Sequence, residues 1–155
     1  KGSIKRIFPL RLIIRDNMEE NLRREIILDN YNDPMNRGLI DDDTYLKTRT
    51  NSESCIDDLN FIMKVENGII KDIRFDGEAC AISTSATSIM IRSLIGKTVE
   101  ETRKLLENYQ NMINDKEYNK ELLGELNVYD NIQPNRRNCA LLPSVAVNKM
   151  LEELK

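Results

Sequence analysis

The chain has 155 residues, of which 40% are hydrophobic and 32% charged, so it can form one domain with its own core and is too apolar for a disordered chain. Its 23 Lys and Arg against 26 Asp and Glu give a net charge of −3, without the clustered basic excess that nucleic-acid binding requires. The absence of His excludes mechanisms that need an imidazole. The apolar runs are far shorter than the ~20 residues that cross a bilayer. We therefore expect no nucleic-acid or membrane partner.

Residues 1–17 differ in composition from the rest of the chain. They are basic, and their apolar patch is interrupted by Pro9 and Arg11 with no small-residue cleavage site after it, which argues against a signal peptide. Met18 then precedes an orderly helix start. We expect residues 1–17 to be an added segment in front of the natural start, with a native N-terminal extension as the alternative, and residues 18–155 to form a single domain.

The hydrophobic period changes near residue 80. Before it, Asp58–Glu66 alternates apolar and polar residues as a half-buried strand does, and Asn67-Gly68 indicates a hairpin because both residues tolerate positive φ. After it the period is helical, and Thr98 with Glu101 predicts a capping box. In chain order, we predict a helix over 19–31, strands over 44–50, 58–66 and 69–76, a helix ending at Gly96, a helix after Thr98, a polar insert over 114–126 with a short helix at 118–123, and a last helix with Pro143 in its first turn. This is an α+β fold, a small antiparallel sheet with helices packed against it.

Three cysteines, Cys55, Cys80 and Cys139, carry the candidate chemistry. Their odd number, without a secretory signal, favours a reducing compartment such as the cytoplasm over a disulfide framework, and no C-x-x-C pair marks a zinc ribbon. Scattered cysteines are most often small buried hydrophobic residues. All three, however, fall at junctions between predicted elements, where a rigid scaffold can aim reactive side chains.

The sequence has four distinctive segments, three of which contain the cysteines: ILDNYNDPMNRG at 27–38, Cys55-Ile56-Asp57, DGEACAISTSATSIM at 76–90, and PNRRNCAL at 134–141. In these segments the sequence resembles the SufU-type iron–sulfur assembly proteins of the wider NifU/IscU-like group, from about Leu22 to the C-terminus, with Cys55-Ile56-Asp57 in place of the family's Cys-Gly-Asp. The Cys55-to-Cys80 spacing fits the whole group, and the longer interval from Cys80 to Cys139 fits the SufU branch.

The resemblance implies a zinc site made by Cys55, Asp57, Cys80 and Cys139, with Asp58 as an alternative carboxylate. Three thiolates and one carboxylate suit tetrahedral zinc. By the same resemblance, zinc holds Cys55 until a pyridoxal-phosphate cysteine desulfurase docks. Cys55 is then released to accept the desulfurase's persulfide sulfur, which passes on to a downstream iron–sulfur scaffold.

Departures from the family pattern bear on the choice between sulfur acceptor and scaffold. Ile56 replaces the family's glycine, which removes positive-φ freedom where the loop folds around the ion. Asn138 stands where scaffold-type relatives carry a His ligand, and their Leu-Pro-Pro-Val-Lys motif is absent before Cys139. Asn138 and the missing Leu-Pro-Pro-Val-Lys motif both favour a zinc-dependent sulfurtransferase. A scaffold on which an iron–sulfur cluster is assembled, and a metal-free interaction domain with incidental cysteines, remain as alternatives.

Overall fold

The structure is a computed structural model that describes residues 19–51 and 56–154. The predicted boundary between residues 1–17 and a domain from residue 18 lies outside the described residues, as does Cys55. Throughout the two described ranges, every helix is too short or too polar to serve as a bilayer-crossing segment.

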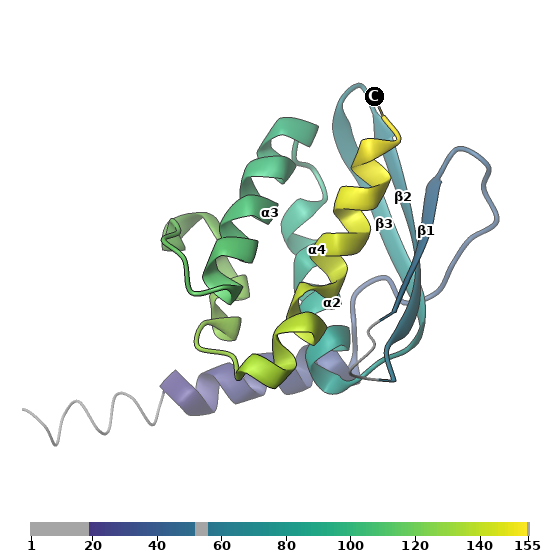
Figure 1. The fold of residues 1–155 in the computed structure, drawn as a ribbon. Helices are drawn as coiled ribbons and strands as arrows, with labels where there is room; N and C mark the ends of the chain where they lie inside the picture. Colours follow the sequence, from purple (N-terminus) through teal and green to yellow (C-terminus); the bar gives the residue numbers. More distant parts are fainter. Residues whose placement is uncertain (1–18, 52–55, 155) are drawn as a thin grey trace, which may run out of the picture.

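A three-stranded antiparallel sheet forms one layer of the molecule, with strand order β1-β2-β3 (Figure 1). The strands are β1 (Leu46–Asn51), β2 (Asp58–Glu66) and β3 (Ile69–Glu78). Asn67 and Gly68 join β2 to β3 with φ of 54° and 73°, which confirms the predicted hairpin turn.

A bulge shifts the register of this hairpin close to its turn. Lys64 pairs with Asp72 whereas the next residue, Val65, pairs with Ile70, so β3 holds one extra residue there. As a consequence Ile70 is fully buried and Ile69 is half-buried. Simple alternation cannot anticipate such a change, because each one-residue step moves a side chain to the other face of the sheet.

Helices gather on one side of the sheet, which confirms the predicted α+β fold (Figure 1). They are α2 (Ala81–Leu94), α3 (Val99–Ile113) and α4 (Arg137–Glu152), and α4 packs against α2, α3 and β1. The N-terminal helix, residues 19–32, crosses the lower end of the molecule in Figure 1.

The middle of helix α2, residues 83–91, is buried on all sides, and its five serines and threonines are as inaccessible as its aliphatic residues. Each buried hydroxyl therefore needs a hydrogen-bond partner inside the protein. Ser85 Oγ lies 2.5 Å from the hydroxyl of Tyr129, whose pKa is raised by burial, and Ser88 Oγ donates to Asn30 Oδ1 at 2.7 Å. The helix therefore joins its neighbours by polar contacts as well as by apolar packing.

The last helix begins earlier than the sequence suggested. The prediction placed Pro143 in its first turn, but α4 starts at Arg137 and contains Pro143 in its interior. A short 3-10 turn that begins with Pro134 leads into it, so Pro134 is the proline that opens the helical segment. The carbonyl of Cys139, to which residue 143 would otherwise donate, has the Ser83 hydroxyl of α2 at 3.0 Å as an alternative donor, which makes a proline at position 143 less costly.

Candidate metal centre

Three of the four predicted ligands meet at one end of the sheet. Asp57 immediately precedes β2, Cys80 immediately precedes α2, and Cys139 lies in the first turn of α4. Since Asp58 pairs with Glu78 in the antiparallel ladder, the start of β2 and the end of β3 bring Asp57 next to Cys80. The carboxylate and the two sulfur atoms lie within 4.8 Å of one another, and among the described residues this is the group with a metal-binding arrangement.

Asp57 and Cys80 are joined through the helix start. Cys80 is the N-cap of α2, and its Sγ accepts from the backbone N–H of Ser83 at 3.4 Å. Its own backbone N–H donates to Asp57 Oδ1 at 2.7 Å, and Asp57 Oδ2 lies 3.8 Å from Cys80 Sγ. One carboxylate oxygen thus orients the side chain while the other lies near the Cys80 thiol.

Ser83 is a site residue that the sequence analysis missed. Its fully buried hydroxyl donates to Asp57 Oδ2, contacts the Cys139 carbonyl at 3.0 Å, and lies 3.5 Å from Cys80 Sγ. The signal that could have found it is its position three residues after Cys80, because the third residue after an N-cap commonly takes part in capping.

The structure distinguishes between the two neighbouring aspartates. Asp57 is 2% exposed and faces the thiols, whereas Asp58 belongs to β2 and accepts two hydrogen bonds from the Arg49 guanidinium at 2.6 and 2.8 Å. The hydrogen bond from Arg49 holds the pKa of Asp58 below its usual value. Ile56 is 77% exposed, so the replacement of glycine leaves the Asp57 carboxylate beside the sulfur atoms. Asp57 is the carboxylate that fits the site.

Gly77 allows this end of the hairpin to close. Its φ is 128°, and a Cβ atom there would lie 2.2 Å from the carbonyl oxygen of Asp58. Any other residue would strain the backbone and push β3 away from β2. Since Cys80 follows three residues later and Asp57 precedes β2, that separation would move the two ligands apart.

The donor set has the chemistry of a zinc site. Zinc accepts thiolate and carboxylate ligands in tetrahedral geometry, and structural or switchable sites commonly tie separate elements together in this way. The carboxylate and Cys139 are buried and Cys80 is half-buried, so a bound ion would be largely shielded from water. Two sulfurs and one oxygen leave one position for a fourth donor.

Comparison with known proteins places this arrangement in a family. The NifU-like N-terminal domain family matches residues 22–143, a range that includes all three converging ligands. The chain belongs to this family. The extent of the match agrees with the resemblance inferred from the cysteine segments.

Relatives of this NifU-like domain carry two kinds of name. The Bacillus subtilis protein named zinc-dependent sulfurtransferase SufU is 30% identical over 133 residues, covering 84% of this chain and 89% of that protein. The Thermotoga maritima protein named iron–sulfur cluster assembly scaffold protein IscU is 32% identical over 132 residues, covering 84% and 92%. A crystal structure from Fervidobacterium islandicum, described as a putative iron–sulfur cluster assembly scaffold protein for the SUF system, is 30% identical with a TM-score of 0.74, covering 82% of this chain and 94% of that one.

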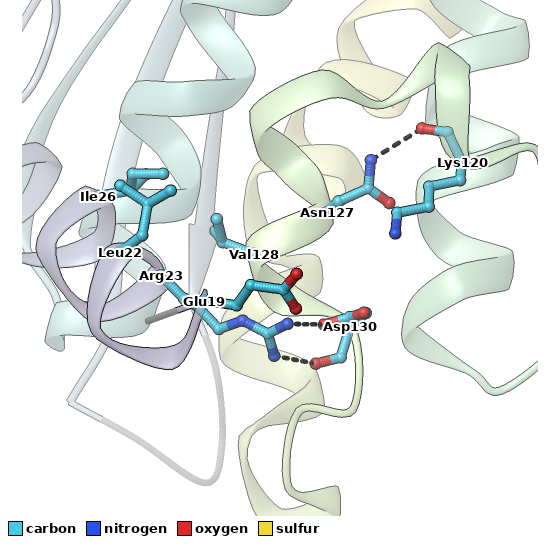
Figure 2. Close-up of a pocket in the computed structure, with 8 residues that line it drawn as sticks. All are labelled: Glu19, Leu22, Arg23, Ile26, Lys120, Asn127, Val128 and Asp130. Carbon is cyan, nitrogen blue, oxygen red and sulfur yellow. Dashed lines mark hydrogen bonds and ion pairs between the residues drawn. The ribbon is translucent and has the colours of Figure 1, made fainter. Parts of the chain in front are cut away.

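A groove of about 280 Å³ lies between the N-terminal helix and the segment that connects α3 to α4 (Figure 2). Arg23 closes one side of it through an ion pair of 2.8 Å with Asp130. The connecting segment contains 3-10 helices over Lys120–Leu122 and Gly124–Tyr129, so the predicted short helix at 118–123 is confirmed in part. The groove's lining includes no cysteine, and the groove is therefore not part of the candidate metal centre. Its lining residues are Glu19, Leu22, Arg23, Ile26, Lys120, Asn127, Val128 and Asp130.

Proposed function

We propose that this NifU-like domain is a zinc-dependent sulfurtransferase of iron–sulfur cluster assembly. In this proposal Cys55, Asp57, Cys80 and Cys139 hold zinc, and Cys55 accepts sulfur from a pyridoxal-phosphate cysteine desulfurase for delivery to a downstream iron–sulfur scaffold. The observation that carries it is the convergence of Asp57, Cys80 and Cys139, from three separate elements, within 4.8 Å. Incidental cysteines in a metal-free interaction domain would have no reason to share a buried carboxylate.

The three described ligands differ in what constrains them. Cys80 is held by its place at the start of α2, and Cys139 by a fully buried position in the first turn of α4. Asp57 lies outside regular secondary structure, and its orientation depends on hydrogen bonds to Cys80 and Ser83. Among the described candidate ligands, Asp57 is therefore the one whose side chain can move most easily when a ligand leaves or joins the ion. When bound, zinc keeps its cysteine ligands as thiolates, the nucleophilic form.

The reaction assigned to Cys55 is a thiol–persulfide exchange. The Cys55 thiolate attacks the outer sulfur of the desulfurase's persulfide and forms a new S–S bond. The bond within the donor persulfide breaks, and the desulfurase cysteine leaves as a thiolate. No external oxidant is needed, because the transferred sulfur keeps its oxidation state.

A cluster scaffold is the second candidate function. Thiolates that bind zinc can also bind iron, and the Thermotoga maritima relative is named a scaffold protein. Asn138 at the position of the scaffold-type His ligand favours the sulfurtransferase, because the amide is a poor substitute for an imidazole ligand.

Elemental analysis and desulfurase kinetics test the proposal together. We expect about one zinc per chain in the purified protein and faster sulfide production when the protein is added to a cysteine desulfurase with reductant present. Cys55→Ala should abolish the stimulation, whereas Ser54→Ala, the same substitution one residue away, should retain it. A stable reconstituted cluster without stimulation would favour the scaffold, and a protein that binds neither zinc nor iron would support the metal-free alternative.

A further inference from the structure

Ser83 lies where the three candidate ligands meet, and the proposed function gives it no part beyond its hydrogen bond to Asp57. Its hydroxyl is in contact with two buried acceptors, Asp57 Oδ2 and the carbonyl oxygen of Cys139. A hydroxyl has a single proton, so a full hydrogen bond to one acceptor weakens the bond to the other. Inside a protein such a choice matters more than at the surface, because water cannot replace the lost bond.

The carbonyl of Cys139 lies where α4 departs from the regular helical pattern. In an α-helix this oxygen would accept from the N–H of residue 143, and Pro143 has no N–H. The Ser83 hydroxyl approaches the same oxygen from α2 at 3.0 Å. Ser83 is therefore a hydrogen-bond donor available to α4 at the turn that carries Cys139, one of the candidate ligands.

Asp57 makes the position of the Ser83 proton depend on the metal. Oδ1 accepts from the backbone N–H of Cys80, whereas Oδ2 lies 3.8 Å from Cys80 Sγ and is the oxygen to which Ser83 donates. We propose that Ser83 is a positioning residue with two states. Its hydroxyl holds Asp57 Oδ2 while that oxygen is not a zinc ligand, and turns to the carbonyl of Cys139 when Oδ2 becomes one. This inference rests on the proposed function, because it requires Asp57 to bind and to leave the ion.

The two states predict the direction in which zinc release changes. Ser83→Ala removes a hydrogen bond to a charged acceptor from the state in which the carboxylate has left the ion. From the zinc-bound state it removes a bond to a neutral carbonyl. Because bonds to charged groups are the stronger, we expect Ser83→Ala to slow zinc release about fivefold. A purely structural role predicts the opposite, a loosened site that loses zinc faster.

The experiment follows transfer of zinc from the loaded full chain to an excess of a chromophoric chelator. Ser144→Ala is the matched control, because Ser144 is also fully buried and donates to the Leu141 carbonyl at 2.6 Å, within α4. We expect slower transfer from Ser83→Ala and an unchanged rate from Ser144→Ala. The absorption bands of the cobalt(II)-loaded protein should be the same in Ser83→Ala and wild type, because the ligands are the same.

A double-mutant comparison tests the part assigned to the carboxylate. In an Asp57→Asn background, Ser83→Ala should alter the release rate by less than about twofold, because no charged oxygen remains to be held. Release from Ser83→Ala as fast as from wild type, or an equal slowing in Ser144→Ala, would overturn the inference and leave the proposed function intact. A wild-type protein that takes up neither zinc nor cobalt would overturn both.

Discussion

The starts of α2 and α3 both need acceptors for backbone N–H groups that have no partner within the helix, and they use different residues to provide them. At α3, Thr98 Oγ1 accepts from the backbone N–H of Glu101 at 3.0 Å, and the Glu101 carboxylate accepts in return from the N–H of Thr98 at 3.0 Å. At α2, Cys80 Sγ accepts from the N–H of Ser83 at 3.4 Å. The returning carboxylate there belongs to Asp57, 23 residues earlier in the chain, and it accepts from Cys80 at 2.7 Å.

The difference shows how a helix cap can provide ligands for the proposed metal site. The α3 cap is local and exposed, so it contributes to stability alone. In the α2 cap, a thiol replaces the hydroxyl and a buried carboxylate from another element replaces the local one. Sulfur is a weak hydrogen-bond acceptor, so the α2 cap is the poorer of the two as a cap and the better as a pair of zinc ligands.

Removal of zinc should lower the free energy of unfolding the most, and this effect should involve the α2 cap and not the α3 cap. At free zinc a thousandfold above its Kd, stripping the ion with a chelator should lower the free energy of unfolding by about 4 kcal/mol. Urea unfolding with and without chelator measures this. Thr98→Ala should show the same zinc-dependent decrease, because the α3 cap is separate from the site. A melting curve that the chelator leaves unchanged would contradict the comparison.

Cys80→Ser should make the α2 cap a stronger hydrogen-bond acceptor and remove one of its two candidate zinc ligands. In zinc-free protein the new hydroxyl is a better N-cap acceptor than the thiol, and we expect the free energy of unfolding to rise by about 0.5–1 kcal/mol. The same variant should lose most of the stabilisation by zinc. Thr98→Ser, an exchange between two good caps, should change stability less. If zinc-free Cys80→Ser unfolds more easily than zinc-free wild type, the thiol does not weaken the α2 cap.

The smallest expected effect concerns pH and the local cap. The hydrogen bonds that the Glu101 carboxylate accepts from Thr98, first from its backbone N–H and then from its side chain, hold the pKa of Glu101 below its usual 4.5. A lowered folded-state pKa stabilises the protein above pH 4.5, and the contribution is lost as the pH falls through the folded-state value. Glu101→Gln should therefore be less stable than wild type near neutral pH, with a difference that disappears in acid. Glu107→Gln removes the same charge from the middle of α3, and an identical pH profile there would refute the role of the cap.

Features encoded by neighbouring residues could be predicted from the sequence. The Asn67-Gly68 turn, the Thr98 capping box and the start of α2 after Cys80 are each confirmed, because the interactions that define them span only a few residues. The start of α4 was misplaced because Pro143 is accommodated with the help of Ser83, a residue of another helix. Interactions between distant segments leave no local pattern.

The same distinction applies to the candidate site. Cys80 and Cys139 stand out by type, and their convergence with Asp57 followed from the family resemblance. The sequence left Asp57 and Asp58 as alternatives, since the choice depends on which side of β2 faces Arg49. Ser83 went unnoticed because a serine in a helix usually indicates an exposed face, and residues 83–91 of α2 have no such face.

Pro143 has a mechanical consequence for the whole centre. Because the backbone ladder of α4 is interrupted at this proline, the turn that carries Cys139 is tethered sideways to Ser83 as well as along its own axis. Both described cysteines are thereby connected to α2: Cys80 because it is the N-cap of the helix, and Cys139 because its carbonyl contacts Ser83. Asp57 is connected to α2 as well, since it accepts hydrogen bonds from the backbone N–H of Cys80 and from the Ser83 hydroxyl. A tilt of α2 would therefore disturb all three described ligands at once.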